Sequence, residues 1–190
     1  MCKSCHNMFS VVVATTIEQV KQIKALQMEN LRRLLPVETQ LRDGFVTAEY
    51  TQEYLEQLHA ESPAIIALDE AGHVVGYVLA VTRSTAAHHS LLADLAEKVD
   101  SDRIVDSNSQ NNYILVGQLC VAKHARGHSL AGRMYDVYRA EYKRRGFYCA
   151  VTDVADDNQI SMNVHKKAGW IVAKSITFES VSFSIVILPF

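Results

Sequence analysis

The sequence predicts a mixed α/β (α+β) fold in which helices flank one sheet of about seven strands. Three observations support this. The 190 residues fit one core, because compact domains contain roughly 100 to 200 residues each. Strand-like runs alternate with helical patterns, and helical crossovers imply parallel neighbours. Two runs are joined by a short turn, which implies an antiparallel pair. We expect a single domain over residues 1–190, with residues 1–8 loosely ordered.

The first part of the chain predicts a short strand and two helices. Val11–Val13 is short and β-branched, and Thr15 with Glu18 fits a capping box at the start of a helix. We expect this helix to continue to Pro36, because proline disfavours helical geometry in the residue before it. A second helix is expected near residues 50–60, after a polar stretch. The apolar face of the first helix consists of Ile17, Val20, Ile23, Leu31 and Leu34.

The next segment predicts a hairpin, a helix and a loop. Residues 63–69 and 73–82 are apolar runs, and residues 70–72 between them have the length and glycine content of a hairpin turn. Residues 88–99 indicate a short helix. The polar residues 101–112 indicate a surface loop.

The strongest strand and the longest helix follow. Tyr113–Val121 is the most regular apolar run, and Gly117 inside it predicts a bulge or a close approach of the backbone to a ligand. From Ala125 the pattern is helical and ends at Gly146. We expect the helix face that packs on the sheet to include Leu130, Met134, Tyr135, Val137, Tyr138 and Tyr142.

The last segment predicts three strands and one helix. Residues 147–151 form a strand, and Asp157 is expected to cap a helix over residues 158–168. Residues 170–173 and 181–188 form the last two strands. The apolar final strand leaves a homodimer open, through pairing or swapping of that strand between copies.

Composition limits the partners. Nineteen basic and 21 acidic residues give a net charge of -2, which lacks the basic field of a nucleic-acid-binding protein. No apolar run approaches the roughly 20 residues that cross a bilayer, and the N-terminal residues lack the features of an export signal. We therefore expect a cytoplasmic protein with neither nucleic-acid nor membrane partners.

The N-terminal CKSCH motif has the spacing for haem attachment, and its Cys2 and Cys5 that of half a zinc site. Haem attachment belongs with exported proteins, and no second close pair of Cys or His follows. We expect no metal site, and we expect Cys120 and Cys149 to be free thiols.

Residues 121–131 carry the chain from the strongest strand into the long helix. Successive backbone N–H groups at such a turn, with the helix dipole behind them, form an anion site. Neither the Gly-Lys-Ser/Thr of a P-loop nor the three spaced glycines of a dinucleotide fingerprint is present.

Two motifs in this region resemble those of the GNAT acetyltransferase superfamily. Arg126, Ser129 and Ala131 occupy the three positions of its Gln/Arg-x-x-Gly-x-Gly/Ala loop, with serine in place of the usual glycine. Residues 158–170 resemble its Asn-x-x-Ala/Ser-x-x-x-Tyr/His-x-x-x-Gly-Phe signature, with His165 where many members have tyrosine. The resemblance covers about residues 63–170 and implies a mostly antiparallel sheet.

The resemblance implies acetyl-coenzyme A as the donor, with its pantetheine along the strongest strand and its diphosphate on the loop amides. It also implies direct transfer to an amine, so neither Cys120 nor Cys149 is needed as a nucleophile. A side chain at position 129 restricts how closely a diphosphate approaches and prefers negative φ. The expected donor-binding residues are Leu119, Cys120, Val121, Arg126, Gly127, His128, Ser129, Leu130, Ala131, Asn158 and Ser161.

Direct transfer needs a neutral amine, a donor to the oxyanion and a proton for the departing thiolate. Backbone N–H groups around residues 119–121 are expected to serve the oxyanion. His165 is either the acid or a histidine packed beside the pantetheine, since an imidazolium near pKa 6.5 is acidic enough to protonate a thiolate near 8.5. Asp153 is the candidate base, with bulk water as the alternative.

The sequence therefore predicts an acetyl-coenzyme A dependent N-acetyltransferase with an amine-bearing acceptor that is a small molecule or a peptide. The alternative is a noncatalytic sensor or regulatory subunit that binds coenzyme A or acyl-coenzyme A. Ser129 and the lack of an acidic residue on the strongest strand keep this alternative open.

Overall fold

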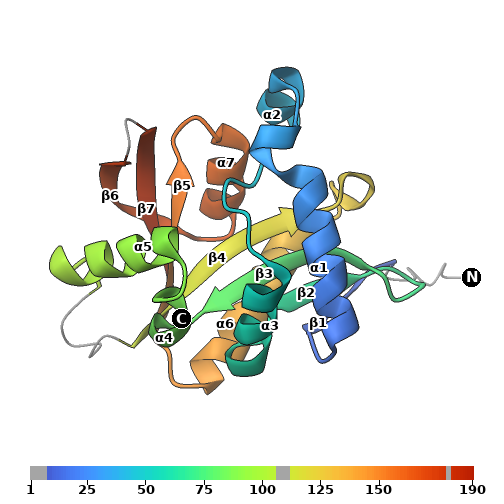
Figure 1. Ribbon diagram of the computed structural model, residues 1–190, viewed down its shortest axis with the longest axis horizontal. Helices are drawn as coiled ribbons and strands as arrows, with labels where there is room; N and C mark the ends of the chain where they lie inside the picture. The colour runs from blue at the N-terminus through green and yellow to red at the C-terminus, as the bar shows by residue number, and fades with distance from the viewer. Residues whose placement is uncertain (1–7, 106–111, 179–180) are drawn as a thin grey trace, which may run out of the picture.

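The computed structural model describes residues 8–105, 112–178 and 181–190 (Figure 1). These residues form one seven-stranded sheet in the order β1-β2-β3-β4-β5-β7-β6. Only β4 and β5 are parallel neighbours, so the predicted mixed, mostly antiparallel sheet is confirmed. The strands are β1 Ser10–Val13, β2 Ile65–Leu68, β3 Val74–Val81, β4 Tyr113–Val121, β5 Cys149–Ala155, β6 Ile171–Phe178 and β7 Val181–Pro189.

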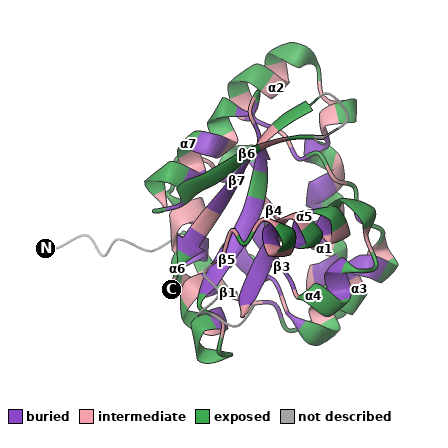
Figure 2. Cartoon of the chain, turned by 90° about the vertical axis from the view of Figure 1, so that its left-hand side faces the viewer, coloured by how far each residue is buried: buried purple, intermediate pink, exposed green. Residues whose placement is uncertain are grey.

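Helices cover both faces of the sheet. Figure 2 shows α6 and α7 on one side and α1, α3, α4 and α5 on the other. The crossover helix α6 connects β4 to β5 and packs across the strands from β1 to β5. Within the described ranges, no helix has both the length and the apolar character needed to span a membrane. The helices are α1 Ile17–Asn30, α2 Val37–Asp43, α3 Gln52–Glu61, α4 Arg83–Ala86, α5 Ser90–Ser101, α6 Leu130–Arg144 and α7 Gln159–Lys167.

The aromatic stripe on α6 is part of the core, as predicted. The side chains of Tyr135, Tyr138 and Tyr142 are fully buried. Their hydroxyl groups also find partners: Tyr138 donates to Leu115 O at 3.0 Å, and Tyr142 donates to Pro63 O at 2.6 Å. The three tyrosines therefore stabilise the packing of α6 on the sheet.

The cap of α1 lies one residue later than predicted. Thr16, not Thr15, accepts from the Gln19 backbone N–H at 3.2 Å, and the Gln19 side chain accepts from Thr16 N at 3.2 Å. Glu18 has no part in this capping box. The reason is that a glutamine closes a capping box as well as a glutamate does.

The cap of α7 is also shifted by one residue. Asn158, not Asp157, caps the helix by accepting from Ser161 N at 3.2 Å. Asp157 instead pairs with Arg32 at 2.6 Å. The carboxylate of Asp157 is therefore engaged in an ion pair with a residue far away in sequence, which the local pattern does not show.

The first helix ends at Asn30, earlier than the predicted end near Pro36. The Asn30 side chain donates back to Leu26 O at 2.8 Å, and Leu31 forms an isolated bridge with Val46. Helix α2 then follows Pro36 and was not predicted, because its apolar residues are exposed and give no inward-facing period.

The later strands are longer than predicted. β5 extends beyond Val151 to Ala155, so Asp153 lies inside the strand and not after its end. β7 lies between β5 and β6 and is paired along both edges, so neither of its edges is open to a strand of a second copy. Of the predicted loop at 101–112, residues 106–111 lie outside the described residues; α5 ends at Ser101, and residues 102–105 follow it as turn and irregular chain.

Candidate functional site

The site begins where β4 and β5 separate. The two strands pair only from Tyr113↔Cys149 to Leu115↔Val151. Beyond that point, Thr152 Oγ1 donates to Val116 O at 2.7 Å, and the remaining edge of β4 faces no strand. Parallel strands that diverge leave backbone groups free for a ligand.

The open edge of β4 presents two backbone N–H groups. Ala122 N donates to Val75 O of β3 at 2.8 Å, which fixes the direction of alternate amides. Because successive N–H groups of a strand point to opposite sides, those of Leu119 and Val121 point into the gap. These are the residues expected to contact the pantetheine and the oxyanion.

The predicted bulge at Gly117 is confirmed. Leu79 pairs with Gln118 and Ala80 with Val116, so Gly117 is the extra residue. A Cβ on this glycine would lie 2.8 Å from Val81 Cγ2 and 3.4 Å from the Tyr50 hydroxyl. Tyr50 itself donates to Gly117 O at 2.9 Å. The bulge therefore requires glycine and bends β4 just before its open edge.

A cavity of about 610 Å³, here called the loop cavity, runs along this edge. Its walls are the end of β4, residues 125–132, α7 and residues 43–46. Of the expected donor-binding residues, ten line it: Leu119, Cys120, Val121, Arg126, Gly127, Ser129, Leu130, Ala131, Asn158 and Ser161. His128 does not, because its ring packs against Phe9 with centroids 5.0 Å apart.

The backbone of Gly127 and of residues 129–132 forms the end wall of the loop cavity. None of these amides donates a hydrogen bond to any residue that the structure describes. They stand at the N-terminus of α6, where the helix dipole favours an anion. Gly127 has φ +83°, and Ser129 has φ 56° and ψ 23°, a left-handed conformation that costs a serine more than a glycine.

Arg126 does not offer a free backbone N–H group to the loop cavity, although the sequence predicted that it would. Its own amide donates to Lys123 O at 3.4 Å, so the free donors begin at Gly127. Its guanidinium donates to Val121 O and to Asn30 Oδ1, both at 3.0 Å, and lies 3.8 Å from Asp43. The side chain thus ties the loop to α1 and to the end of α2.

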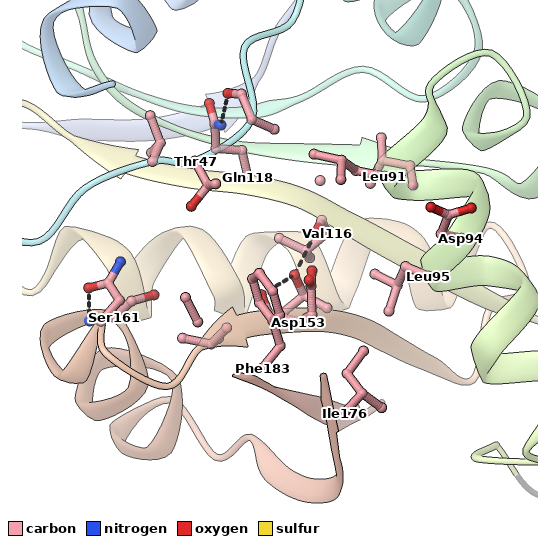
Figure 3. Close-up of a pocket in the computed structure, with 18 of the residues that line it drawn as sticks. Thr47, Leu91, Asp94, Leu95, Val116, Gln118, Asp153, Ser161, Ile176 and Phe183 are labelled. Atoms are coloured by element: carbon pink, nitrogen blue, oxygen red, sulfur yellow. Dashed lines mark hydrogen bonds between the residues drawn. The ribbon is translucent and has the colours of Figure 1, made fainter. Parts of the chain in front are cut away.

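A second cavity of about 440 Å³, here called the β5 cavity, adjoins the first. Figure 3 shows the side chains that line it, from β4, β5, α5, α7 and the last hairpin. The two cavities share five lining residues: Phe45, Val46, Leu119, Asn158 and Ser161. A molecule in the loop cavity and another in the β5 cavity would therefore meet at this junction.

Asp153 projects from β5 into the β5 cavity. Asp153 is exposed within the cavity, yet desolvation by the surrounding walls raises the pKa of its carboxyl group above the ordinary value. No ion pair or side-chain hydrogen bond with the described residues holds it. An unpartnered carboxylate with a raised pKa is suited to accept a proton.

His165 lines the same cavity but is buried and fully bonded. Because a carbonyl only accepts, the contact with Ser161 O at 2.8 Å makes Nδ1 the protonated nitrogen, and Nε2 then accepts from the Tyr135 hydroxyl at 2.8 Å. Burial lowers the pKa of His165 to about 4, so the ring is neutral near pH 7. Of the two alternatives for His165, the geometry favours the packed histidine over the acid.

Asn158 and Ser161 stand at the junction. The Asn158 side chain caps α7 through Ser161 N and donates to Phe45 O at 3.0 Å, so its amide group joins two walls of the loop cavity. Ser161 Oγ lies 3.4 Å from His165 Nδ1. Among the described residues, Ser161 is the only one with a side-chain hydroxyl that lines both cavities.

Cys120 and Cys149, the two cysteines within the described ranges, are poor nucleophiles. Both are free thiols and buried, as predicted. Burial raises the pKa of Cys120 to about 12 and that of Cys149 to about 11, so both are protonated near neutral pH. A covalent intermediate on either sulfur is therefore disfavoured.

Sequence reasoning did not find the walls supplied by α2, α5 and the last hairpin. Asp43 and Phe45 reach the loop cavity, and Leu91 and Asp94 reach the β5 cavity. No local pattern marks these residues, because tertiary packing alone brings them to the junction.

No cluster of three or more His, Cys, Asp or Glu in the described ranges is arranged to hold a metal ion. Cys2, Cys5 and His6 lie outside these ranges.

Comparison with protein families identifies one match, the acetyltransferase (GNAT) family, over residues 28–170. Among curated protein sequences, none matches this chain significantly.

Several solved structures are similar. A GNAT superfamily phosphinothricin acetyltransferase from Sinorhizobium meliloti, in complex with AcCoA, is 14% identical with a TM-score of 0.63, covering 96% of this chain and 89% of that one. The ribosomal-protein-S18-alanine N-acetyltransferase from Escherichia coli is 10% identical, with a TM-score of 0.61 and coverage of 96% and 94%. The NatC complex bound to Gag peptide and CoA is 15% identical, with a TM-score of 0.64 and coverage of 96% and 98%.

Proposed function

Because the chain belongs to the acetyltransferase (GNAT) family, we propose that it is an N-acetyltransferase that moves an acetyl group directly from acetyl-coenzyme A to a primary amine. The observation that carries this proposal is the meeting of the two cavities at Ser161. One cavity ends in unpaired amides suited to a diphosphate, and the other contains an unpartnered carboxylate suited to an amine. The acceptors named for the similar structures range from phosphinothricin to a protein, so the fold does not identify the acceptor.

The donor would occupy the loop cavity. Its diphosphate would accept hydrogen bonds from the amides of residues 127–132 at the N-terminus of α6. Its pantetheine would lie along β4, bonded to the backbone of Leu119 and Val121, and its thioester would reach the junction. Lys167 also lines this cavity and would attract the phosphates.

Transfer requires two proton movements, the formation of a carbon–nitrogen bond and the cleavage of the carbon–sulfur bond. Asp153 takes a proton from the acceptor ammonium, directly or through a water, and the amine nitrogen then forms a bond to the thioester carbonyl carbon. A β4 N–H stabilises the resulting oxyanion, an interaction worth about 3 kcal/mol. The carbon–sulfur bond breaks, its electron pair leaves on sulfur, and the second proton of the nitrogen passes to the thiolate.

The proton for sulfur would pass through Ser161 and water, and not through His165. Ser161 Oγ lies at the junction, whereas both ring nitrogens of His165 are engaged inside the protein. His165 acts here as a positioning residue, since its Nδ1–H holds Ser161 O at 2.8 Å.

The first test is calorimetric titration with acetyl-coenzyme A and with desulfo-coenzyme A, followed by a thiol-release assay on a panel of amines. Binding with thiol release on some amine supports the transferase. Binding without release on any amine supports the noncatalytic sensor. No binding contradicts the assignment of the loop cavity.

A matched pair of proline variants tests the loop amides. Ala131→Pro removes one free N–H in the first turn of α6, and Glu18→Pro makes the same change in the first turn of α1, away from both cavities. We expect only Ala131→Pro to weaken binding of both nucleotides, by about tenfold or more, because a hydrogen bond to a charged group contributes about 1.5–3 kcal/mol. Equal affinities in the two variants would argue against diphosphate binding at these amides.

A further inference from the structure

The β5 cavity has an excess of negative charge. Its lining contains three carboxylates, from Asp94, Glu97 and Asp153, and one ammonium, from Lys98. That ammonium is already engaged, since Lys98 Nζ lies 3.2 Å from Asp102 Oδ2. Asp102 also binds Lys174 at 2.9 Å, so this ion-pair cluster lies beside the cavity without neutralising the three carboxylates.

The three carboxylates are unpaired within the described part of the chain. No ion pair there involves Asp94, Glu97 or Asp153. All three residues are exposed. They are therefore free to bind a cation that enters from solvent.

The carboxylates occupy two separate positions. In Figure 3, Asp153 on β5 lies between Ser161 at the junction and Asp94 on α5. Asp94 and Glu97 are one turn apart on α5. The cavity thus has a carboxylate beside the thioester position and a second pair of carboxylates farther from it.

Apolar side chains line the cavity beside these positions. Leu91 and Leu95 are on the same face of α5 as Asp94, and Ile176 and Phe183 line the cavity from the last hairpin. Leu91 is 42% exposed, a large exposed fraction for a leucine on an amphipathic helix. An alkyl chain in the cavity would cover it and remove apolar surface from water.

We infer that the acceptor is a small aliphatic diamine or polyamine, in which one amino group reacts beside Asp153 while a second is bound as a cation by Asp94 and Glu97. This inference rests on the proposed function and names the acceptor class of the same site. The volume of about 440 Å³ lies at the small end of ligand sites, which run from about 300 to 1,000 Å³. A monoamine of equal length would leave the α5 carboxylates without a partner.

The test compares amines that differ only in the second charge: putrescine against n-butylamine, and cadaverine against n-pentylamine. Thiol release and product mass give kcat/KM, and calorimetry on protein saturated with coenzyme A gives affinity without turnover. We expect the diamines to exceed the monoamines by about fivefold to tenfold in both measures, as befits a partly screened charge pair. The double variant Asp94→Asn, Glu97→Gln should reduce this preference to about twofold or less, while Asp136→Asn, an exposed site on α6, should leave it unchanged.

The outcomes separate this inference from the proposed function. Acetylation of both amine classes at equal rates would overturn the diamine inference and leave the transferase intact. Diamine binding that depends on Asp94 and Glu97, without acetylation of any amine, would support the cation site on α5 and contradict both the transferase and the role of the diamine as acceptor. A preference for N-acetyl-lysine amide over cadaverine would identify a peptide acceptor and overturn the inference. The absence of binding and reaction with every amine would also overturn it.

Discussion

The loop cavity and the β5 cavity meet at Ser161, but they are built from different parts of the chain. The end wall of the loop cavity is backbone, from consecutive residues at the start of α6. The β5 cavity is lined by side chains from α5, β5 and the β6–β7 hairpin, which are far apart in sequence. A backbone site keeps its chemistry when side chains change, whereas a side-chain site can change ligand with one substitution.

This difference predicts different responses to mutation. Side-chain changes in the β5 cavity should alter turnover and acceptor choice without affecting the donor. Changes of backbone conformation in the loop should alter donor affinity without affecting acceptor choice. The predictions below follow this comparison from the largest expected effect to the smallest.

Asp153→Asn should give the largest loss of activity. Removing a general base lowers kcat/KM by about 100- to 1,000-fold, and the donor affinity should stay within about twofold because Asp153 does not line the loop cavity. The rise of kcat/KM with pH that reports ionisation of Asp153 should disappear in the variant. Steady-state rates from pH 4 to pH 9 measure kcat/KM and its pH dependence, and parallel calorimetry measures the donor affinity. Full activity in the variant would leave bulk water as the base.

The same substitution should raise stability. The raised pKa of Asp153 means that the folded state binds a proton more tightly than the unfolded state, so wild type loses stability as pH rises from the ordinary value of 3.8 through the folded value. Because asparagine does not ionise, the variant does not lose stability as pH rises. The variant should have the higher Tm at pH 7, and the difference should vanish at low pH, where Asp153 is protonated in both states.

His165→Ala should affect stability more than chemistry. It removes a buried ring and leaves the Tyr135 hydroxyl without its acceptor, so the free energy of unfolding should fall by about 3 kcal/mol. Turnover per folded molecule should fall by less than about tenfold, since a residue that only positions Ser161 takes no proton. Tyr135→Phe is the milder control, because it removes only the hydroxyl. A 100-fold loss of turnover in a fully folded variant would restore His165 as the acid.

The pH dependence of stability tests the same residue. A folded pKa of about 4 against an ordinary 6.5 means that the unfolded state binds the proton more tightly, so stability is complete above pH 6.5 and falls as pH decreases to 4. The shift corresponds to about 3 kcal/mol. Urea unfolding at several pH values should show this slope in wild type and a smaller one in His165→Ala.

The local geometry of the backbone-built half of the site was easier to predict from the sequence than the walls of the other half. Gly117, Gly127 and Ser129 were readable because turns, bulges and helix starts depend on residues close together in the chain. The α5 wall was not readable, since Leu91 and Asp94 resemble any surface helix until tertiary packing brings them beside β5. The assignment of His165 as an acid depended on its burial, which no local pattern shows.

The fold follows the same rule. The hairpin of β2 and β3 was predicted because both strands and their turn are local. The position of β7 between β5 and β6 was not, because it depends on which distant strand accepts it. The start of α7 was displaced by one residue since Arg32, far away in sequence, takes Asp157.

Gly117→Ala tests the bulge that bends β4 before its open edge. The new Cβ would lie 2.8 Å from Val81 Cγ2, and overpacking of this kind costs about 1–3 kcal/mol. Donor affinity should also fall, because the N–H groups of Leu119 and Val121 follow the bulge. Val81→Ala in the same chain should recover part of both losses, as measured by thermal unfolding and calorimetry. Strict additivity of the two substitutions would mean that this contact is not the cause.

Ser129→Gly should give the smallest effect and should improve the protein. Ser129 has φ 56°, where a side chain costs about 1 kcal/mol relative to glycine, so the variant should be more stable and bind acetyl-coenzyme A a few times more tightly. Gly127→Ala provides the opposite change in the same loop, since Gly127 has φ +83° and no atom within 4 Å of a new Cβ. It should lose about 1 kcal/mol through conformation alone. Because both variants act on the backbone of the loop cavity, the ratio of diamine to monoamine rates should be the same in each as in wild type, and a changed ratio would mean that the two cavities are not independent.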